Sequence, residues 1–295
     1  MCSTIYKLIR IYAILPFMIA CLLLRVQSQA QSLLPTHPLV QLDLKTAYET
    51  RAFLHFHRAA DKVLPLFLAV NSGAHQTAED EIQKELDAFV AFLKKKQSAY
   101  KNDERFLQYM YYKVHHKYLK RYTQYPDFLS LFEAGLYDCV TGTALYAYLL
   151  DTLGYTYTIQ ELEYHIYLLV WPRETQNNLQ QAYFLIESTD PQYGFVSNRS
   201  DIQKRIQWYN NEENSATANA NYQYNFEINN TINLIELAGL AYYNSAVAHY
   251  NHQQFAKAIT QLKKAKFLYE SQRMEAFMNL IDDTLATMPQ SKLTH

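Results

Sequence analysis

The segment GLYDCVTGTALYAYLLDTLGY, residues 135–155, decides the fold. From Cys139 onward it is apolar nearly all round, which predicts a buried helix over about 139–153 whose N-terminal end alone reaches a surface. Asp138 is a residue type that commonly caps a helix N-terminus, and Gly154 suits the left-handed conformation that often ends a helix. Cys139 therefore opens a core helix, either as a reactive nucleophile or as a small buried residue.

Two strand-like runs follow this helix. EYHIYLLV (163–170) and AYFLIESTD (182–190) are rich in β-branched and aromatic residues, and the polar stretch WPRETQNNLQQ separates them. We expect the two runs to pair as an antiparallel hairpin that turns at Asn177–Asn178, which places Asp190 directly opposite His165. A slip of one residue would put these two side chains on opposite faces of the sheet, and a slip of two would leave them diagonal neighbours on one face.

Helical patterns fill the chain before this segment. Apolar residues recur three and four positions apart through much of residues 40–130, as in TAEDEIQKELDAFVAFLKKKQSAY (77–100). The 295 residues include only 6 glycines and 8 prolines, which are residues that tight turns need. A helical N-terminal layer, a central helix that carries the cysteine and a small antiparallel sheet together predict an α+β fold.

The C-terminal part is predicted to be a separate helical segment. Residues 209–231 are dense in Asn and poor in aliphatic residues, which predicts a linker or loop. The pattern of residues 232–290 predicts a helical tail that forms a helical hairpin. This tail resembles a tetratricopeptide repeat. Small and aromatic residues recur there at the spacing that lets two antiparallel helices approach, namely Ala246, Ala258, Ala265, Tyr242, Tyr250 and Phe255. One repeat is too short to be stable alone, so we expect the tail to pack on the preceding domain or on a protein partner.

Residues 1–30 have the pattern of a secretory signal peptide. A basic start is followed by the fourteen apolar residues IYAILPFMIACLLL (11–24) and by small residues that suit cleavage after Ala30. The apolar stretch is short for a membrane span. We therefore expect a periplasmic or secreted protein that has its main domain over residues 31–208 and no membrane span after cleavage. A lipoprotein signal that ends before Cys21 and an uncleaved anchor are the alternatives.

Cleavage would change both the charge and the thiol content. Because it removes Lys7, Arg10 and Arg25, the formal net charge would fall from −1 to −4. A mildly acidic chain without a basic stripe lacks the electrostatic footprint of a nucleic-acid-binding protein, so we expect no nucleic-acid partner. Cleavage also removes Cys2 and Cys21, which leaves one thiol and no possible internal disulfide.

The central segments contain a cysteine, a histidine and a carboxylate in a suggestive order. Cys139 opens a helix, His165 lies in the first strand-like run and Asp190 ends the second, and these are the parts of a covalent acyl-transfer site. Over residues 135–195 the chain resembles the transglutaminase-like superfamily, relatives of papain-type cysteine peptidases. The matching elements are YDCVTGTALYAYLLDTLGY, EYHIYLLV and FLIESTDPQYGF.

The resemblance implies a role for each of these residues. Cys139 would be the nucleophile, His165 the general base and then acid, and Asp190 the carboxylate that orients the imidazole. The backbone N–H of Cys139 would form part of an oxyanion hole, with Gln124 or Tyr137 as the second donor. The implied function is thiol-dependent acyl transfer without a cofactor. Hydrolysis of an amide bond in a peptide or protein substrate is favoured over transfer to an amine.

The sequence also leaves an alternative acid and an alternative function open, and it bears on metal binding. Glu187 replaces Asp190 as the orienting acid if the strand register differs. The alternative function is a non-catalytic binding or assembly protein, in which the transglutaminase-like core is a scaffold and the helical tail holds a partner peptide. His115 and His116 are adjacent on a predicted helix, so we expect them on a solvated face. His249 and His252 share a helix face, but no third ligand is evident in the tail. We therefore predict no metal site.

Overall fold

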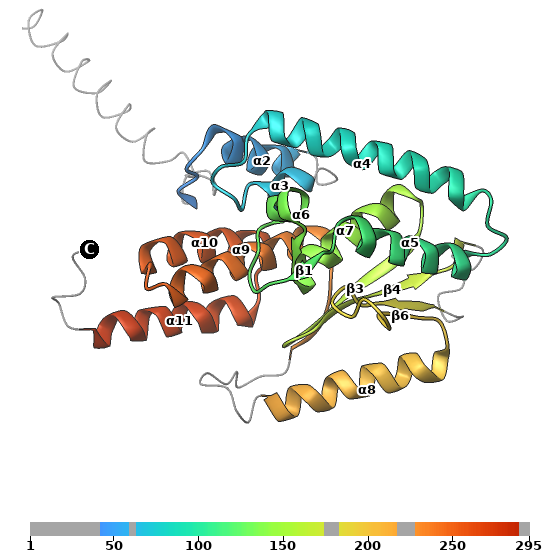
Figure 1. Ribbon diagram of the computed structural model, residues 1–295. Helices are drawn as coiled ribbons and strands as arrows, with labels where there is room; N and C mark the ends of the chain where they lie inside the picture. Colours follow the sequence, from blue (N-terminus) through green and yellow to red (C-terminus); the bar gives the residue numbers. More distant parts are fainter. Residues whose placement is uncertain (1–41, 59–62, 174–182, 217–227, 289–295) are drawn as a thin grey trace, which may run out of the picture. The chain divides into compact units, whose positions relative to one another are not determined.

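A five-stranded antiparallel sheet with helices on both faces forms the centre of the fold (Figure 1). The computed structural model describes residues 42–58, 63–173, 183–216 and 228–288. The strand order is β6-β5-β4-β3-β7, and the bounds are β3 (Thr156–Leu162), β4 (Ile166–Trp171), β5 (Phe184–Ile186), β6 (Phe195–Val196) and β7 (Asn229–Ile232). Two short strands, β1 (Arg121–Tyr122) and β2 (Leu136–Tyr137), pair separately in parallel.

Helices make up most of the rest of the described chain. They are α2 (Ala47–Arg58), α3 (Leu64–Leu68), α4 (Gln76–Gln97), α5 (Asp103–Lys117), α6 (Phe128–Ala134), α7 (Cys139–Thr152), α8 (Arg199–Ala216), α9 (Leu234–Asn251), α10 (Phe255–Leu268) and α11 (Gln272–Thr287). A helix-rich chain with one small antiparallel sheet confirms the predicted α+β class at this level.

Helix α7 forms where the sequence predicts it. The Asp138 carboxylate accepts a hydrogen bond from the Thr141 N–H, and the Thr141 hydroxyl accepts one from the Asp138 N–H, so the two residues form a capping box. Gly154 has a φ of +77°, the left-handed conformation that ends the helix at little steric cost. The helix between these signals is almost entirely buried.

The strand pairing differs from the predicted hairpin in two ways. First, β3 and β4 form a tight hairpin, closed by a 2.8 Å hydrogen bond from the Leu162 N–H to the His165 carbonyl. Second, β4 pairs with β5 one residue away from the predicted register, since Leu168 lies opposite Ile186. Both of these side chains are fully buried, and burial on one face is what fixes a strand register. The expected turn at Asn177–Asn178 lies outside the described residues.

The two faces of the sheet are covered by different helices, α7 on one face and α8 on the other (Figure 1). On the α8 face, Leu162, Tyr167 and Leu185 pack in one cluster with Ile202 and Tyr209 of α8. Because side chains alternate along a strand, the neighbouring buried residues of β4 and β5 point to the α7 face. The sheet is therefore buried from both sides.

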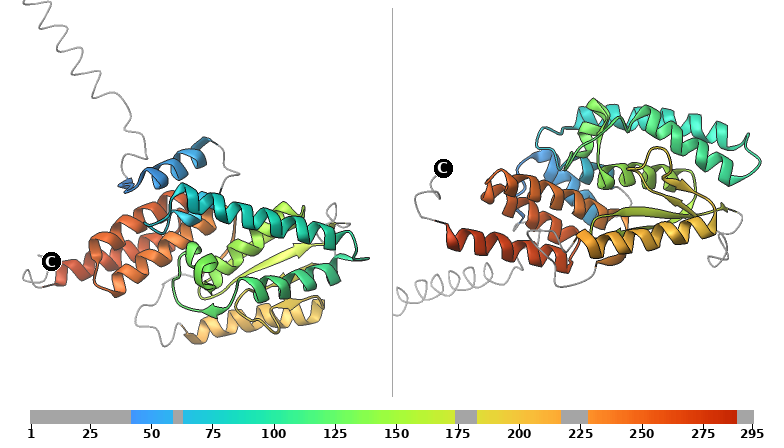
Figure 2. Two further views of the ribbon diagram at one scale, coloured as in Figure 1. Left: turned by 45° about the horizontal axis from the view of Figure 1, so that its top comes forward. Right: turned by 60° about the horizontal axis from the view of Figure 1, so that its bottom comes forward.

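The C-terminal helices α9, α10 and α11 lie side by side (Figure 2). The small residues Ala246, Ala258 and Ala265 are fully buried, and the Tyr250 ring lies 5.6 Å from that of Phe255. Within the compact unit that spans residues 44–295, Lys264 of α10 forms a buried ion pair of 2.6 Å with Glu49 of α2. The tail therefore packs on the preceding domain, as expected for a single repeat-like unit.

The predicted linker over residues 209–231 is regular structure at both of its ends. Helix α8 continues to Ala216, because the buried Tyr209 anchors it to the sheet, and Asn229–Ile232 is strand β7, because it pairs with β3. Residues 217–227 lie outside the described residues, as do the predicted signal peptide, Cys21 and the cleavage position at Ala30. Within the described ranges, no helix combines the length and hydropathy that crossing a membrane requires.

Candidate functional site

Cys139 is the first residue of α7 and keeps part of its surface accessible to solvent. The residue before it, Asp138, is buried and bonds in two directions. One carboxylate oxygen accepts from Thr141, and the other accepts from the Asn244 side chain of α9 at 3.0 Å. The start of the cysteine helix is therefore held both by its own cap and by the helical tail.

The surroundings of the thiol keep it protonated. Burial among the surrounding elements raises the pKa of Cys139 well above its ordinary value, and the negative charges of Asp138 and Glu187 raise it further. The positive charge of Arg273 acts in the opposite direction and does not outweigh them. At neutral pH the resting thiol is therefore neutral, whereas the attacking species in thiol catalysis is the thiolate.

His165 directly precedes β4, where the β3–β4 hairpin closes. It shares a strand face with Tyr167 and lies across the hairpin from Leu162, and both of these residues pack against α8. Its imidazole accordingly lies against that helix, with ring centroids 4.4 Å from Tyr209 and 5.8 Å from Trp208. His165 thus points to the α8 face of the sheet, whereas Cys139 belongs to the helix on the other face.

Asp190 is engaged by a cation of α8. Its carboxylate forms a 2.7 Å ion pair with Arg205 and accepts a 3.0 Å hydrogen bond from the Tyr193 N–H. Partial burial acts to raise the pKa of Asp190, but the bonds from Arg205 and Tyr193 hold it below its ordinary value. The pairing of β4 with β5 ends at Leu168 and Ile186, so Asp190 lies in the turn after β5 and is not paired with His165.

Glu187 is a buried carboxylate that directly follows β5. If the register of β4 and β5 continued one residue further, Glu187 would lie opposite Tyr167 and diagonally across from His165. The side chain is 4% exposed, and it accepts hydrogen bonds from the N–H and the hydroxyl of Thr189. Burial raises the pKa of Glu187. Glu187 is therefore a second carboxylate, beside Asp190, at this end of the sheet.

The three candidate elements meet at one end of the sheet. The first turn of α7 touches the end of β5 so closely that a Cβ atom on Gly142 would lie 2.7 Å from the Ser188 side chain. The end of β5 and the start of β4 lie at the same end of an antiparallel pair. The fold therefore gathers Cys139, Glu187 and His165 at one end of the sheet while directing Cys139 and His165 to different sides of it.

The two oxyanion candidates differ in their surroundings. Gln124 is exposed in the segment after β1. Tyr137 is buried in β2, and its ring packs edge-on against those of Tyr122 and His115. Burial raises the pKa of the Tyr137 hydroxyl, so this group is protonated at neutral pH and able to donate a hydrogen bond.

His115 is a buried residue that the sequence analysis placed wrongly on a solvated face. It is 8% exposed, its ring lies 4.7 Å from that of Tyr111, and neither ring nitrogen has a hydrogen-bond partner. Burial lowers the pKa of His115 to about 4, although the charge of Asp190 acts in the opposite direction. Its neighbour His116 is exposed. The apolar residues Tyr111 and Leu119, four positions before and after, were the available signal that His115 lies on the buried face.

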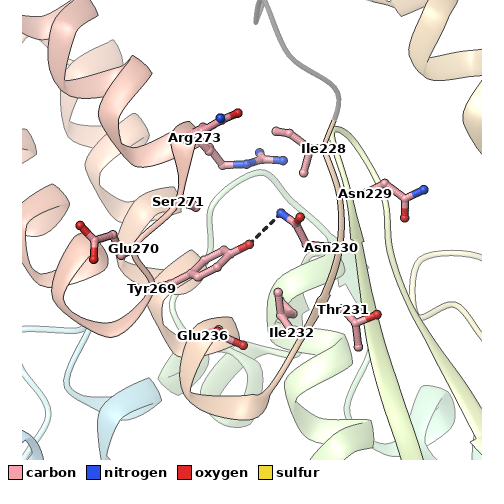
Figure 3. A pocket seen from close by; sticks show the side chains of 11 residues that line it. Ile228, Asn229, Asn230, Thr231, Ile232, Glu236, Tyr269, Glu270, Ser271 and Arg273 are labelled. Carbon is pink, nitrogen blue, oxygen red and sulfur yellow. Dashed lines mark hydrogen bonds between the residues drawn. The ribbon is translucent and has the colours of Figure 1, made fainter.

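A polar hollow of about 470 Å³ lies between β7 and the connection from α10 to α11 (Figure 3). Two of its lining residues contact the buried Glu161, which accepts a 2.6 Å hydrogen bond from the Tyr269 hydroxyl and lies 3.1 Å from the Nε atom of Arg273. Asn230 of β7 donates to both Glu161 and Tyr269. Arg273 also donates to the carbonyl oxygens of the hairpin residues Leu162 and Glu163. This network joins the sheet to the tail.

The chain has no recognisable relative in three comparisons. It matches no protein-family model, no curated protein and no solved structure. Among the residues that the structure describes, no three His, Cys, Asp or Glu side chains are grouped so that they could hold a metal ion.

Proposed function

We propose that the protein is a non-catalytic binding or assembly protein, in which the transglutaminase-like core is a scaffold and the helical tail completes the binding surface. The observation that carries this proposal is the packing of the His165 ring against Tyr209 of α8, on the face of the sheet opposite α7. A nucleophile and its general base must come within about 3 Å of each other, directly or through one water. Here α7 covers one face and the His165 imidazole lies against Tyr209 on the other.

The electrostatics around Cys139 support the same conclusion. A catalytic cysteine is commonly surrounded by positive charge that stabilises the thiolate. Asp138 and Glu187 instead raise the pKa of the thiol, in addition to the effect of burial. Such a residue behaves as a small, inert component of the core.

The buried contacts of the tail also fit a binding function. Lys264 and Glu49 form a buried ion pair, and Arg273 holds the β3–β4 hairpin by its carbonyl oxygens. The tail is therefore one rigid part of the surface that the core presents, and rigid surfaces bind partners with a low entropic cost.

A thiol-dependent acyl-transfer enzyme is the second candidate, because Cys139, His165 and Glu187 lie at one end of the sheet. In that mechanism the Cys139 sulfur attacks the carbonyl carbon of an amide, and the imidazole takes the thiol proton and delivers it to the leaving amine. Water then attacks the thioester and releases the acid. Glu187 would orient the imidazole in place of Asp190. This function requires the His165 ring to leave Tyr209 and pass around the end of the sheet.

Alkylation of Cys139 as a function of pH distinguishes the two candidates. We expect slow alkylation of the full-length protein by iodoacetamide at pH 6 to 8, read by mass spectrometry on the peptide that contains Cys139. His165→Phe, which preserves the aromatic packing against Tyr209 but removes the base, should leave the rate unchanged. Rapid alkylation at pH 6 that His165→Phe abolishes would overturn the binding proposal and establish an activated thiol–imidazole pair.

A further inference from the structure

The outer edge of β7 is an unpaired strand edge among the described residues. β7 is the last strand of the sheet and pairs on one side only, with β3. Along an antiparallel strand, the main-chain N–H and C=O groups of successive residues point alternately to the two neighbouring strands. Because Leu162 bonds to His165, the main-chain groups of Leu162 and Gln160 point to β4. Those of Glu161 and Ile159 point to β7. The partners of Glu161 and Ile159 are Asn230 and Ile232. The main-chain N–H and C=O groups of Asn229 and Thr231 therefore point away from the sheet.

The space in front of this edge is the polar hollow described above. Its far wall is the connection from α10 to α11, from which Tyr269 and Arg273 reach toward β7 (Figure 3). An added strand lies about 4.8 Å from its neighbour, so a strand paired with β7 would run through the hollow. Main-chain groups on one side and side chains on the other are the features by which a strand edge binds an extended peptide.

The charges that line the hollow determine which peptide fits. The guanidinium of Arg273 is engaged by the Glu161 carboxylate and by two carbonyl oxygens. Glu236 and Glu270 also line the hollow and are partly or fully exposed, so they add negative charge at its wall. A basic side chain is the complement of this lining.

We propose that an extended peptide segment carrying basic side chains binds here by adding a strand to β7. Its main chain pairs with Asn229 and Thr231, and its lysine or arginine side chains lie against Glu236 and Glu270. This inference deepens the proposed binding function and names the chemistry of the partner. Its test does not involve Cys139, so it stands or falls separately from the alkylation result.

The test measures fluorescence anisotropy of a labelled peptide of alternating Thr and Lys residues titrated with the full-length protein. Two matched peptides serve as controls: one is N-methylated on alternate residues, which removes donors along one edge, and the other carries Glu in place of Lys. We expect each change to weaken binding by at least about tenfold, the loss that one or two hydrogen bonds or charge contacts produce.

Variants of the protein test the same contact between β7 and the peptide by changing the protein in place of the peptide. Thr231→Pro removes an outward N–H without removing a bond to β3, and proline is tolerated on edge strands. We expect Thr231→Pro to weaken binding about tenfold, while Thr231→Ala stays within about twofold of the parent protein. Glu270→Lys should weaken binding of the Lys peptide and strengthen binding of the Glu peptide.

Three results would overturn the proposal. The first is equal binding of the parent and N-methylated peptides, a comparison that remains valid if Thr231→Pro fails to fold. The second is no binding of the Lys peptide at all. The third is a dimer in sedimentation velocity that Thr231→Pro dissociates, because the edge would then be occupied by a second copy of this chain.

Discussion

At the scale of single residues, Asp138 shows how a buried carboxylate joins two parts of the fold. It accepts hydrogen bonds from the N–H and hydroxyl of Thr141 and from the Asn244 side chain. Burial raises its pKa to about 6, since the hydrogen bonds offset only part of the cost of a buried charge. Asp138 therefore caps α7, links it to α9 and raises the pKa of the adjacent thiol.

His115 makes stability depend on pH between 4 and 6.5. Its pKa is about 4 in the folded protein and 6.5 when unperturbed, so the unfolded chain binds a proton in this range and the folded protein does not. The free energy of unfolding should therefore fall as pH is lowered from 7 to 5, by about 2 kcal/mol from this residue. We expect His115→Leu to remove this part of the fall, measured by urea unfolding at both pH values.

The neighbouring residue provides the matched control for this prediction. His116 is exposed on the same helix, so His116→Leu should leave the pH dependence of the unfolding free energy unchanged. If His115→Leu and His116→Leu give the same slope, His115 does not titrate as a buried neutral residue. A parallel loss of stability at every pH would indicate a packing effect alone.

At the scale of elements, the contact between α7 and β5 depends on the absence of a side chain at Gly142. Alanine is a better helix former than glycine by about 1 kcal/mol, so propensity alone predicts that Gly142→Ala stabilises the protein. The added Cβ would lie 2.7 Å from the Cβ and Oγ atoms of Ser188, however. We expect this overpacking to dominate and to destabilise the protein by about 1–3 kcal/mol in thermal or urea unfolding.

A double-mutant cycle tests the cause of that loss. Ser188→Gly removes both of the atoms that the new Cβ would meet, so Gly142→Ala combined with Ser188→Gly should recover most of the destabilisation. Strictly additive losses would show that the two residues do not interact and that α7 accepts a methyl group at this position.

The elements with local signals were predictable, and those without them were not. Helix α7 carries its own start and stop in Asp138 and Gly154, and the structure confirms both. Strand β3 was missed because its hairpin turns at Glu163–Tyr164, which contains neither Gly nor Asn, the usual marks of a tight turn. The register of β4 and β5 was wrong by one residue, because a long connection does not fix the pairing of the strands it joins.

The one-residue error in the β4–β5 register also limited the prediction of the candidate site. The sequence predicted the helix that Cys139 opens and a strand-like run for each of the other two residues. Which carboxylate shares a face with His165 depends on the register, and the β4–β5 pairing ends at Ile186, before both Glu187 and Asp190. The side to which His165 points was not predictable, because no local signal indicated that α8 would pack against that face.

At the scale of the whole molecule, one ion pair joins residues 215 positions apart. Lys264 and Glu49 are 1% and 4% exposed, and their charged atoms lie 2.6 Å apart. Removal of one partner leaves the other charge buried without compensation. We expect Lys264→Met to destabilise the protein by about 3–5 kcal/mol in urea unfolding.

Two further variants separate the pair from a general effect of losing a lysine. Lys264→Met combined with Glu49→Gln leaves no buried charge at this position and should recover most of the stability, because Gln can still accept the bond from the Lys45 N–H. Lys204→Met breaks the exposed pair with Asp201 and should cost about 0–1 kcal/mol. Equal losses in Lys264→Met and Lys204→Met would contradict the assigned role of the buried pair.

The position of β7 in the sheet has a consequence for the time course of synthesis. Strand β3 leaves the ribosome long before β7, its neighbour on the outer side, and Glu49 emerges even earlier than its partner Lys264. Until the last quarter of the chain is made, the nascent protein presents a bare edge at β3 and a carboxylate without its cation. Such intermediates are prone to aggregation. We therefore expect a chain truncated before β7 to be less soluble than the full-length protein.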